Sequence, residues 1–392
     1  MKEFNLDRLN AKKIQLGERP LVLKRTTYED VVIKDGYLVD SNGKRVGTKG
    51  DMYHKLIMDK ILQEGCLDHN PRPKYHDFYE EAKYDNLKRI IITKENEEIK
   101  VGDNEQVFEK ENGIEVHVPA HTLSVNEGIE CTYDLSKGES PMITLRPIAI
   151  RTSIAEMLWI YQMQSNDLVD FDELLNKNTW DKDHIIHNWW EEWALRDNNG
   201  NYILNEKGHP IIGACYGGST APRNMLYTEV IEQIRKNPDG RRNISCLWQI
   251  DDFKKPHGLK PCAFLTIWNV RHGWDGIDYL DMTLVQRSND FDTAAAINEA
   301  QYVGQHKMVA KDLGYTPGIF TWKPVNVQVY DRHLDQTIEM LNREPITCDA
   351  TIEVNENKNK FTEFTPDDIY LDDYPKELIK KKNPQLKFPL GI

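Results

Sequence analysis

Two side chains suited to covalent chemistry stand on consecutive strand-like segments of this sequence. Cys262 follows Pro261 at the start of one segment, and Arg287 lies near the end of the next, in the run Gln286 to Asp290. A thiolate nucleophile needs nearby positive charge at neutral pH, and a guanidinium supplies it. A guanidinium also binds phosphate through two parallel hydrogen bonds. Although most cysteines are simply buried, this pair predicts covalent chemistry on a phosphorylated small molecule.

Further arginines are candidates for holding a phosphate. Arg241 and Arg242 follow a turn, where adjacent arginines suit either a solvated surface or a phosphate clamp that reaches across a subunit interface. Arg72 lies in a stiff, proline-flanked loop. The formal net charge is −13, which argues against general nucleic-acid binding. An anionic substrate therefore needs such a local cluster of cations.

Two interpretations are open for each of three further features: a carboxylate, a run of tryptophans and a side-chain amide. Glu156 lies among bulky apolar residues, so it either points outward or points inward, where burial raises its pKa and suits it to proton transfer. The tryptophans of residues 189–193 form either core packing or a stacking wall for a flat heterocycle. Asn298 either caps a helix or reads a pyrimidine edge with its donor and acceptor sides.

The periodicity of apolar residues places these groups on regular elements. It predicts helices over 52–64, 153–163, 226–235 and 298–313, and strands over 243–250, 263–270 and 277–285. The last two strands form a hairpin about residues 271–276. Alternation along the first of them places Cys262, Phe264, Thr266 and Trp268 on one face.

The chain is expected to hold one main catalytic domain, over 51–392. A β-rich extension over 1–50 precedes it, with a hairpin turn at Lys34 to Gly36, and a charged lobe is inserted at about 74–119, with strand-like runs at 90–92 and 114–118. The composition, 39% hydrophobic and 29% charged, is that of a soluble globular protein.

Composition also bears on the cellular setting. The six cysteines form no CxxC pair or ligand cluster, so neither disulfides nor a metal site is expected and a reducing cytoplasm is predicted. No stretch approaches the roughly 18–20 apolar residues of a membrane span, and the first residues lack the apolar core of a signal peptide.

In their order and spacing, these residues resemble the thymidylate synthase family from Met52 onward, apart from the insertion. The blocks that carry the resemblance are Glu156 to Trp159, Trp190 to Ala194, Gly213 to Gly217, Asp239 to Arg242, Leu259 to Cys262, Gln286 to Asp290, Ile297 with Asn298, Tyr330 to Gln336 and the apolar tail Lys387 to Ile392. Ala263 stands where the family usually has His, and Gln328 stands where its sugar-contacting motif has His.

The resemblance implies an α+β fold, with a large twisted mixed β-sheet flanked by helices and a sheet-to-sheet homodimer. It also implies the reductive methylation of deoxyuridylate. Cys262 adds to C6 of the ring, C5 takes the one-carbon unit of 5,10-methylenetetrahydrofolate, and hydride from the folate then gives thymidylate and dihydrofolate.

The resemblance assigns roles residue by residue. Glu156 and Tyr216 organise water and proton transfer, and Asn298 holds the pyrimidine edge. The remaining substrate ligands are Gln286, Arg287, Ser288, Arg72, Gln328 and Tyr330, with Arg241 and Arg242 from the partner subunit. Trp190, Trp193, Asp290 and the terminal Ile392 meet the folate.

Two rival functions remain open at this point. A hydroxymethylase on the same scaffold would let water, rather than hydride, quench the intermediate, on deoxyuridylate or deoxycytidylate; Asn298 favours uracil. A non-catalytic homologue that binds nucleotide or its own messenger RNA is disfavoured by the net charge and by the presence of Cys262, Arg287 and Glu156.

Overall fold

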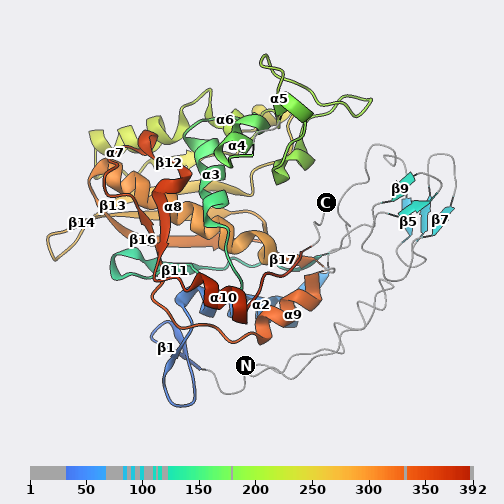
Figure 1. Cartoon of the computed structure of the whole chain (residues 1–392). Helices are drawn as coiled ribbons and strands as arrows, with labels where there is room; N and C mark the ends of the chain where they lie inside the picture. Colours follow the sequence, from blue (N-terminus) through green and yellow to red (C-terminus); the bar gives the residue numbers. More distant parts are fainter. Residues whose placement is uncertain are drawn as a thin grey trace.

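The core of the fold is a five-stranded mixed sheet. The computed structural model describes residues 32–67, 122–177, 180–330 and 333–388, together with five short strands between 83 and 116 (Figure 1). The sheet has the strand order β11-β16-β14-β13-β12, in which β14 and β16 are parallel and the other neighbours are antiparallel. Its strands are β11 (Cys131–Asp134), β12 (Asn243–Cys246), β13 (Ala263–His272), β14 (Asp278–Gln286) and β16 (Thr316–Pro324). The expected α+β class is confirmed.

The predicted hairpin is present as the β13–β14 pair, which carries Cys262 and Gln286 at the same end. Two sequence expectations about these strands are wrong. The strand predicted over 243–250 ends at Cys246. A register shift between Ala263 and Leu265 interrupts the alternation of β13. Because of this bulge, Ala263 rather than Phe264 is buried with Thr266 and Trp268.

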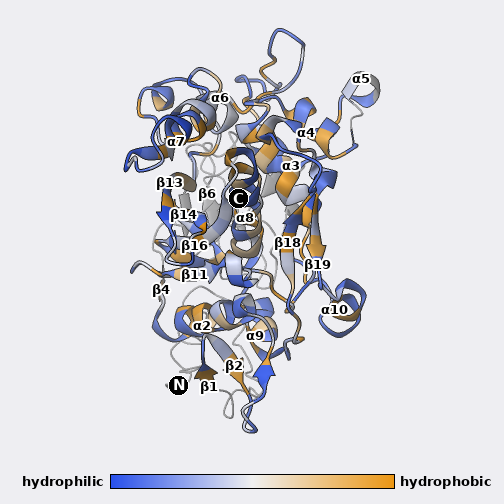
Figure 2. Ribbon diagram, turned by 90° about the vertical axis from the view of Figure 1, so that its left-hand side faces the viewer, coloured by the Kyte–Doolittle hydropathy of each residue, from blue (hydrophilic) through white to orange (hydrophobic). Residues whose placement is uncertain are grey.

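One long helix covers the sheet, and a second helix packs on the far side of the first. α8 (Ala296–Leu313) connects the parallel strands β14 and β16, and α3 (Ile150–Tyr161) packs against it. Figure 2 shows α8 between the central sheet on one side and α3 with the β18–β19 ribbon on the other. This position explains why α8 is buried around most of its circumference. The residue that precedes α8 is Ala295, so the structure excludes the first of the two alternatives for Asn298, that it caps this helix.

A second sheet adjoins the end of β14. Its order is β15-β17-β10-β4, formed by β15 (Asn289–Asp290), β17 (Val327–Tyr330), β10 (Thr122–Val125) and β4 (Cys66–Leu67). β15 and β17 are parallel and pair Asp290 with Gln328. Since β15 follows β14 after two residues, the second sheet places Gln328 and Tyr330 next to the end of the hairpin.

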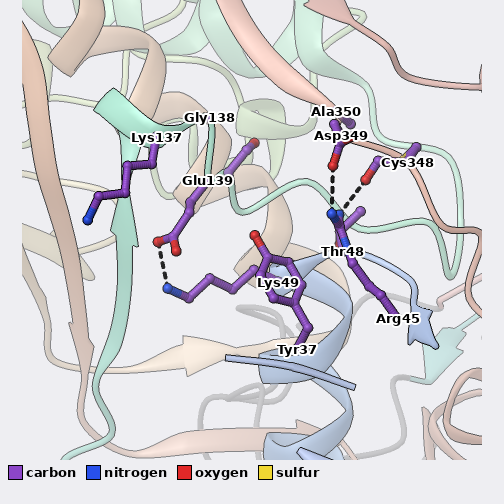
Figure 3. A pocket seen from close by; sticks show the side chains of 11 residues that line it. Tyr37, Arg45, Thr48, Lys49, Lys137, Gly138, Glu139, Cys348, Asp349 and Ala350 are labelled. Atoms are coloured by element: carbon purple, nitrogen blue, oxygen red, sulfur yellow. Dashed lines mark hydrogen bonds and ion pairs between the residues drawn. The ribbon is translucent and has the colours of Figure 1, made fainter. Parts of the chain in front are cut away.

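The predicted N-terminal hairpin is confirmed by β1 (Val32–Lys34) and β2 (Tyr37–Val39), with positive φ at both turn residues, Asp35 and Gly36. With β3 (Arg45–Val46), it leads into α2 (Lys49–Glu64), which matches the predicted helix. Figure 3 shows how this region meets the rest of the chain: Arg45 Nη1 lies 2.6 Å from a carboxylate oxygen of Asp349.

The other elements are shorter. The helices are α4 (Leu168–Leu174), α5 (Trp180–Asp183), α6 (Gly217–Thr220), α7 (Glu232–Lys236), α9 (Leu334–Asn342) and α10 (Lys376–Lys382), with 3-10 turns η3 (Leu135–Lys137), η4 (Trp189–Trp193), η6 (Asp252–Lys254), η9 (Phe361–Glu363) and η10 (Pro366–Asp368) and π-helical turns η5 (Tyr227–Ile231) and η7 (Phe291–Ala295). The paired strands are β18 (Thr351–Val354) with β19 (Ile369–Asp372), β5 (Lys83–Asp85) with β6 (Ile90–Ile92) and β7 (Glu98–Lys100), and β8 (Glu109–Glu111) with β9 (Ile114–Val116).

The helix predicted over 226–235 is thus a π-helical turn followed by α7. No disulfide joins the six cysteines, all of which lie in the described ranges. Among the described helices, none combines the length and apolar character that crossing a membrane requires.

Candidate active site

The predicted nucleophile and guanidinium are in contact. Arg287 Nη2 lies 3.5 Å from the sulfur of Cys262. The arginine is held in place by the main chain before the cysteine, because its Nε donates to the carbonyl of Pro261 at 2.9 Å and its Nη2 to that of Lys260 at 2.8 Å. The guanidinium also lies over the ring of Trp248. A positive charge fixed at this distance stabilises a thiolate.

Tyr216 supports the same segment from the other side. Its hydroxyl oxygen accepts the main-chain N–H of Cys262 at 3.1 Å. The backbone of Tyr216 has φ of 45°, a conformation that is strained for a bulky residue and costs about 1–3 kcal/mol. The following Gly217 has no room for a side chain, since a Cβ would lie 1.7 Å from the carbonyl oxygen of Ser165. Burial raises the pKa of the Tyr216 phenol well above its usual value, so the hydroxyl stays protonated.

Glu156 points inward, which settles the alternative left open by the sequence. It projects from α3, is only 6% exposed and accepts two hydrogen bonds. Trp190 Nε1 donates to one carboxylate oxygen at 2.8 Å, and Gln301 Nε2 donates to the other at 2.6 Å. Burial raises the pKa of Glu156 to about 7, against the opposing effect of these two donors. A carboxyl poised near neutral pH suits proton transfer.

Asn298 is connected to Glu156 by one side chain that lies between them, Gln301. Its Nδ2 donates to Gln301 Oε1 at 3.0 Å, and its Oδ1 accepts from Gln286 Nε2 at 3.0 Å. Gln286 also donates to the carbonyl of Ser288 at 3.1 Å and accepts from Trp322 Nε1 at 3.0 Å. The amide of Asn298 is therefore held by directional hydrogen bonds on both sides, from Gln286 and to Gln301.

The two tryptophans predicted to meet a folate belong to one aromatic cluster. The ring centroids of Trp190 and Trp193 lie 5.7 Å apart, and the ring of Tyr216 lies 4.8 Å from that of Trp190. Trp190 is buried and Trp193 is half-buried. Trp190 therefore packs in the core and also orients Glu156. Trp193 keeps an accessible face, and its role as a stacking wall stays a prediction.

Asp290 combines burial with unused hydrogen-bonding capacity. Its Oδ2 accepts from Thr293 Oγ1, whereas its buried Oδ1 has no hydrogen-bond partner among the described residues. His333 Nδ1 lies 3.9 Å from Oδ1. Burial raises the pKa of the Asp290 carboxyl, and His333 and Thr293 oppose that shift. The contact of Asp290 with a folate stays a prediction.

A second buried carboxylate, Asp292, lies behind Asp290. Its Oδ2 accepts from Thr337 Oγ1 at 2.5 Å, and Arg146 Nη2 donates to its main-chain carbonyl at 2.8 Å. Burial raises the pKa of Asp292 to about 7, and the charge of Asp290 adds to that shift. Phe388, near the end of the described chain, packs over Arg146 and beside His333.

Other predicted residues lie at various distances from this centre. Ser288 and Tyr330 are half-buried near the ends of β14 and β17, and Gln328 pairs with Asp290. Arg241 and Arg242 are exposed, and no described contact joins them to the residues around Cys262. Arg72 and Ile392 lie outside the described residues.

Three contributors were not identified as site residues from the sequence: Gln301, Trp322 and Arg146. Gln301 follows Asn298 by three positions on a helix, a spacing that places two side chains on one face and that offered a usable signal. Trp322 is distant in sequence and is placed only by the parallel pairing of β14 with β16. Arg146 lies in an irregular segment, where no periodicity indicates its direction.

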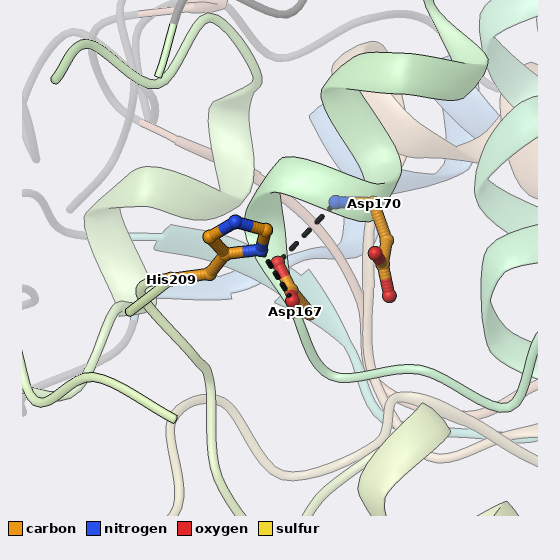
Figure 4. Close-up of side chains that lie close together, drawn as sticks. All are labelled: Asp167, Asp170 and His209. Atoms are coloured by element: carbon orange, nitrogen blue, oxygen red, sulfur yellow. Dashed lines mark hydrogen bonds and ion pairs between the residues drawn. The ribbon is translucent and has the colours of Figure 1, made fainter. Parts of the chain in front are cut away.

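One other cluster has ligand types that suit a cation. Asp167, Asp170 and His209 hold ligand atoms within 4.8 Å of one another (Figure 4). The cluster already has internal partners: His209 Nδ1 lies 2.8 Å from Asp167 Oδ2, and Lys207 Nζ lies 3.2 Å from Asp170 Oδ1. Asp167 also caps α4. These contacts describe a structural polar network that fastens the α4 region.

Comparisons with a family profile, with related sequences and with solved structures all indicate the same family. The family profile described as Thymidylate synthase matches residues 105–386. The thymidylate synthase of Streptococcus sanguinis strain SK36 is 35% identical, and that of Streptococcus mutans serotype c is 39% identical, each over 88% of this chain and the whole of the relative. The solved structure of the thermostable thymidylate synthase A from Bacillus subtilis covers 86% of this chain and 98% of its own, with 25% identity and a TM-score of 0.61.

Proposed function

Because the chain belongs to the thymidylate synthase family, we propose that it converts deoxyuridylate to thymidylate, with 5,10-methylenetetrahydrofolate as cosubstrate. The observation that carries this proposal is the contact of Cys262 with Arg287 at the end of the hairpin, where Gln286 also hydrogen-bonds Asn298 of α8. A nucleophile, a fixed cation and a base-reading amide meet there.

Cys262 acts as the nucleophile on C6 of the pyrimidine ring. Adding sulfur at C6 moves electron density toward C5 and O4, so C5 becomes able to take the one-carbon unit. Asn298 donates an N–H toward O4, where negative charge develops, and accepts the N3–H of uracil. Glu156, with a pKa of about 7, exchanges protons with the ring edge, directly or through water.

Arg287 serves the nucleophile and the phosphate together. Its Nε and Nη2 hold the segment of Cys262, while the two N–H groups on Nη1 take part in no described hydrogen bond. They are suited to a phosphate oxygen. Ser288 and Arg72 complete the ligands from the same chain, and Gln328 and Tyr330 contact the sugar.

The folate lies against Trp190 and Trp193 and donates an N–H to Asp290. Support comes from the accessible face of Trp193 and from the buried Oδ1 of Asp290 that lacks a hydrogen-bond partner among the described residues. By the family resemblance, the terminal Ile392 also contacts the folate. Binding that excludes water favours hydride over water as the group that quenches the intermediate.

The active unit is a homodimer in the cytoplasm, in which Arg241 and Arg242 reach the phosphate of the partner's site. Both arginines are exposed and make no described contact with their own Cys262 region, as this arrangement requires. The reducing setting agrees with six cysteines that no disulfide joins.

The chemistry is tested by incubating the protein with deoxyuridylate and methylenetetrahydrofolate and analysing the products by mass. A methyl product formed with one equivalent of dihydrofolate supports the proposal. A hydroxymethyl product formed with tetrahydrofolate would assign the chain to the rival reaction, which the family match does not favour.

The shared site is tested by mixing two inactive variants. Cys262→Ala lacks the nucleophile, and the double variant Arg241→Ala with Arg242→Ala lacks the phosphate ligands. In a mixed dimer, one site combines an intact Cys262 with intact arginines, so activity should return to about a quarter of the wild-type level for random mixing with one working site in half of the dimers. Exchange of subunits is verified first. If activity does not return after that exchange, the two subunits do not share these arginines.

A further inference from the structure

Six side chains form one continuous run of hydrogen bonds through the site. Trp322 donates to Gln286, Gln286 donates to Asn298, Asn298 donates to Gln301, and Gln301 donates to Glu156, which also accepts from Trp190. Four of these five contacts measure 2.8–3.0 Å, and the contact of Gln301 with Glu156 measures 2.6 Å. The run joins the buried carboxyl to the base-reading amide, with Gln301 as the only described link between them.

The direction of every amide in this run is determined from its ends. An indole N–H can only donate, so Trp322 fixes the oxygen of Gln286 on its side. Gln286 must then present its NH₂, which the carbonyl of Ser288 also accepts. Asn298 therefore turns its oxygen to Gln286 and its nitrogen to Gln301, and Gln301 turns its own nitrogen to Glu156.

This polarity decides which pyrimidine Asn298 accepts. With one N–H used on Gln301, Asn298 offers its other N–H to a ligand. Its oxygen accepts from Gln286 at 3.0 Å and from Asn289 Nδ2 at 3.5 Å, so a ligand donor takes the place of the longer of these contacts. Uracil presents an acceptor at O4 and a donor at N3. Cytosine presents the reverse pattern, so binding it in the same pose requires Asn298 to flip and to lose its contacts with both glutamines.

Gln301 also contributes to the ionisation state of Glu156. Gln301 Nε2 holds one oxygen of Glu156 and favours its ionised form, because a donor to a carboxylate stabilises the negative charge. Gln301 is itself only 4% exposed, so a water molecule does not readily replace it. A ligand that reorients Asn298 would change the donor that reaches Glu156, and a proton on Glu156 would change the amide that faces the base.

We propose that Gln301 is a positioning residue that couples the orientation of Asn298 to the ionisation of Glu156, and so links recognition of uracil to proton transfer. The proposal rests on the proposed function, since it gives Asn298 and Glu156 their roles. It concerns a side chain that touches neither substrate and acts through the two groups that do.

The test replaces Gln301 by Met, which has a similar length and no hydrogen-bonding amide. Gln305→Met is the matched control: Gln305 lies one turn further along α8, is fully buried, and its amide has no hydrogen-bond partner among the described residues. A second variant, Gln301→Ser, leaves room for water in case the Met variant does not fold. Thermal unfolding of each variant is measured alongside.

Two readouts separate positioning from a purely structural role. Without its donor, Glu156 is expected to titrate about one pH unit higher, seen as a shift of the inflection in the pH profile of kcat and in the infrared signal of the protonated carboxyl. Discrimination between deoxyuridylate and deoxycytidylate, measured as a ratio of Kd values by calorimetry without folate, is expected to fall roughly tenfold. Gln305→Met should change neither.

A uniform loss of activity in the Gln301 variants, with the same inflection and the same Kd ratio as wild type, overturns the coupling. So does an equal change in Gln305→Met. The infrared titration and the Kd ratio do not depend on turnover. A wild-type protein that makes no thymidylate therefore contradicts the proposed function, while these two measurements still decide whether Gln301 couples the two groups.

Discussion

The side chain and the main chain of Arg287 both bind Cys262. Its Nη2 lies 3.5 Å from the sulfur, and its main-chain N–H donates to the carbonyl oxygen of Cys262 at 2.9 Å. The contact between the strands therefore sets the distance between charge and nucleophile, and the cation stays in place without a substrate. Preorganised charge of this kind needs no rearrangement when the reaction begins.

Arg287→Lys should slow the reaction of Cys262 with iodoacetamide at pH 7 about tenfold or more, because an ammonium cannot hold two carbonyls and face the sulfur with the same geometry. The rate is measured by peptide mass mapping over a range of pH. Arg271→Lys changes an arginine paired with Asp281 on the same hairpin and serves as control. An equal rate in both variants contradicts the role of Arg287.

Glu156→Gln should lower kcat about 10²–10⁴-fold, the range for loss of a general acid–base group. The inflection near pH 7 should vanish from the pH profile of kcat, since the group with a pKa of about 7 is gone. Deoxyuridylate binding should weaken as well, because the amide keeps the acceptor for Trp190 but turns its NH₂ toward Gln301, which must then reorient together with Asn298. Persistence of the inflection would falsify the assignment of Glu156 as the titrating group.

Tyr216→Phe should destabilise the fold by about 1–3 kcal/mol, because it leaves the main-chain N–H of Cys262 without its acceptor. Urea denaturation followed by circular dichroism measures the change. Tyr227→Phe is the matched control, because the hydroxyl of Tyr227 is buried without a hydrogen-bond partner among the described residues. Its removal should leave stability equal or higher.

Asp292→Asn should make the protein more stable above pH 7 than the wild type. Burial raises the pKa of Asp292 from 3.8 to about 7, so the folded state holds a proton that the unfolded chain releases between these values. The stability of the wild type is thus fully present below pH 4 and is lost as pH rises through 7, by up to roughly 4 kcal/mol from this group.

The measurement for Asp292→Asn is the urea midpoint from pH 4 to 8. The wild type should lose stability more steeply than the variant over this range, and the two should converge at pH 4. Parallel curves would show that Asp292 is ionised in the folded protein and that Arg146 compensates its burial.

The sequence predicted the elements that carry the chemistry more accurately than the contacts between them. The hairpin about residues 271–276, the helix that ends at Gly314 and the pairing of Cys262 with Arg287 follow from local patterns and are present. These are short-range features, which turn chemistry and periodicity specify.

What the sequence could not predict depends on bulges and on distant pairings. The bulge at Phe264 changes which residue of β13 is buried, and alternation alone gives no sign of it. The inward direction of Glu156 could not be predicted, because its partner Gln301 lies far away in the sequence and meets it only where α8 packs against α3. The roles of Arg241 and Arg242 remain predictions, because they require a second subunit.

The reacting groups and the turn of the central hairpin lie at opposite ends of β13 and β14. Cys262 and Gln286 stand at one end of β13 and β14, and the turn with the fully exposed Trp274 stands at the other, nine paired positions away. A fluorescent label or short affinity sequence inserted at that turn would report on the protein without touching the reacting groups. The same turn can also serve to attach the enzyme to a surface, because the end of the hairpin that carries Cys262 then faces away from that surface.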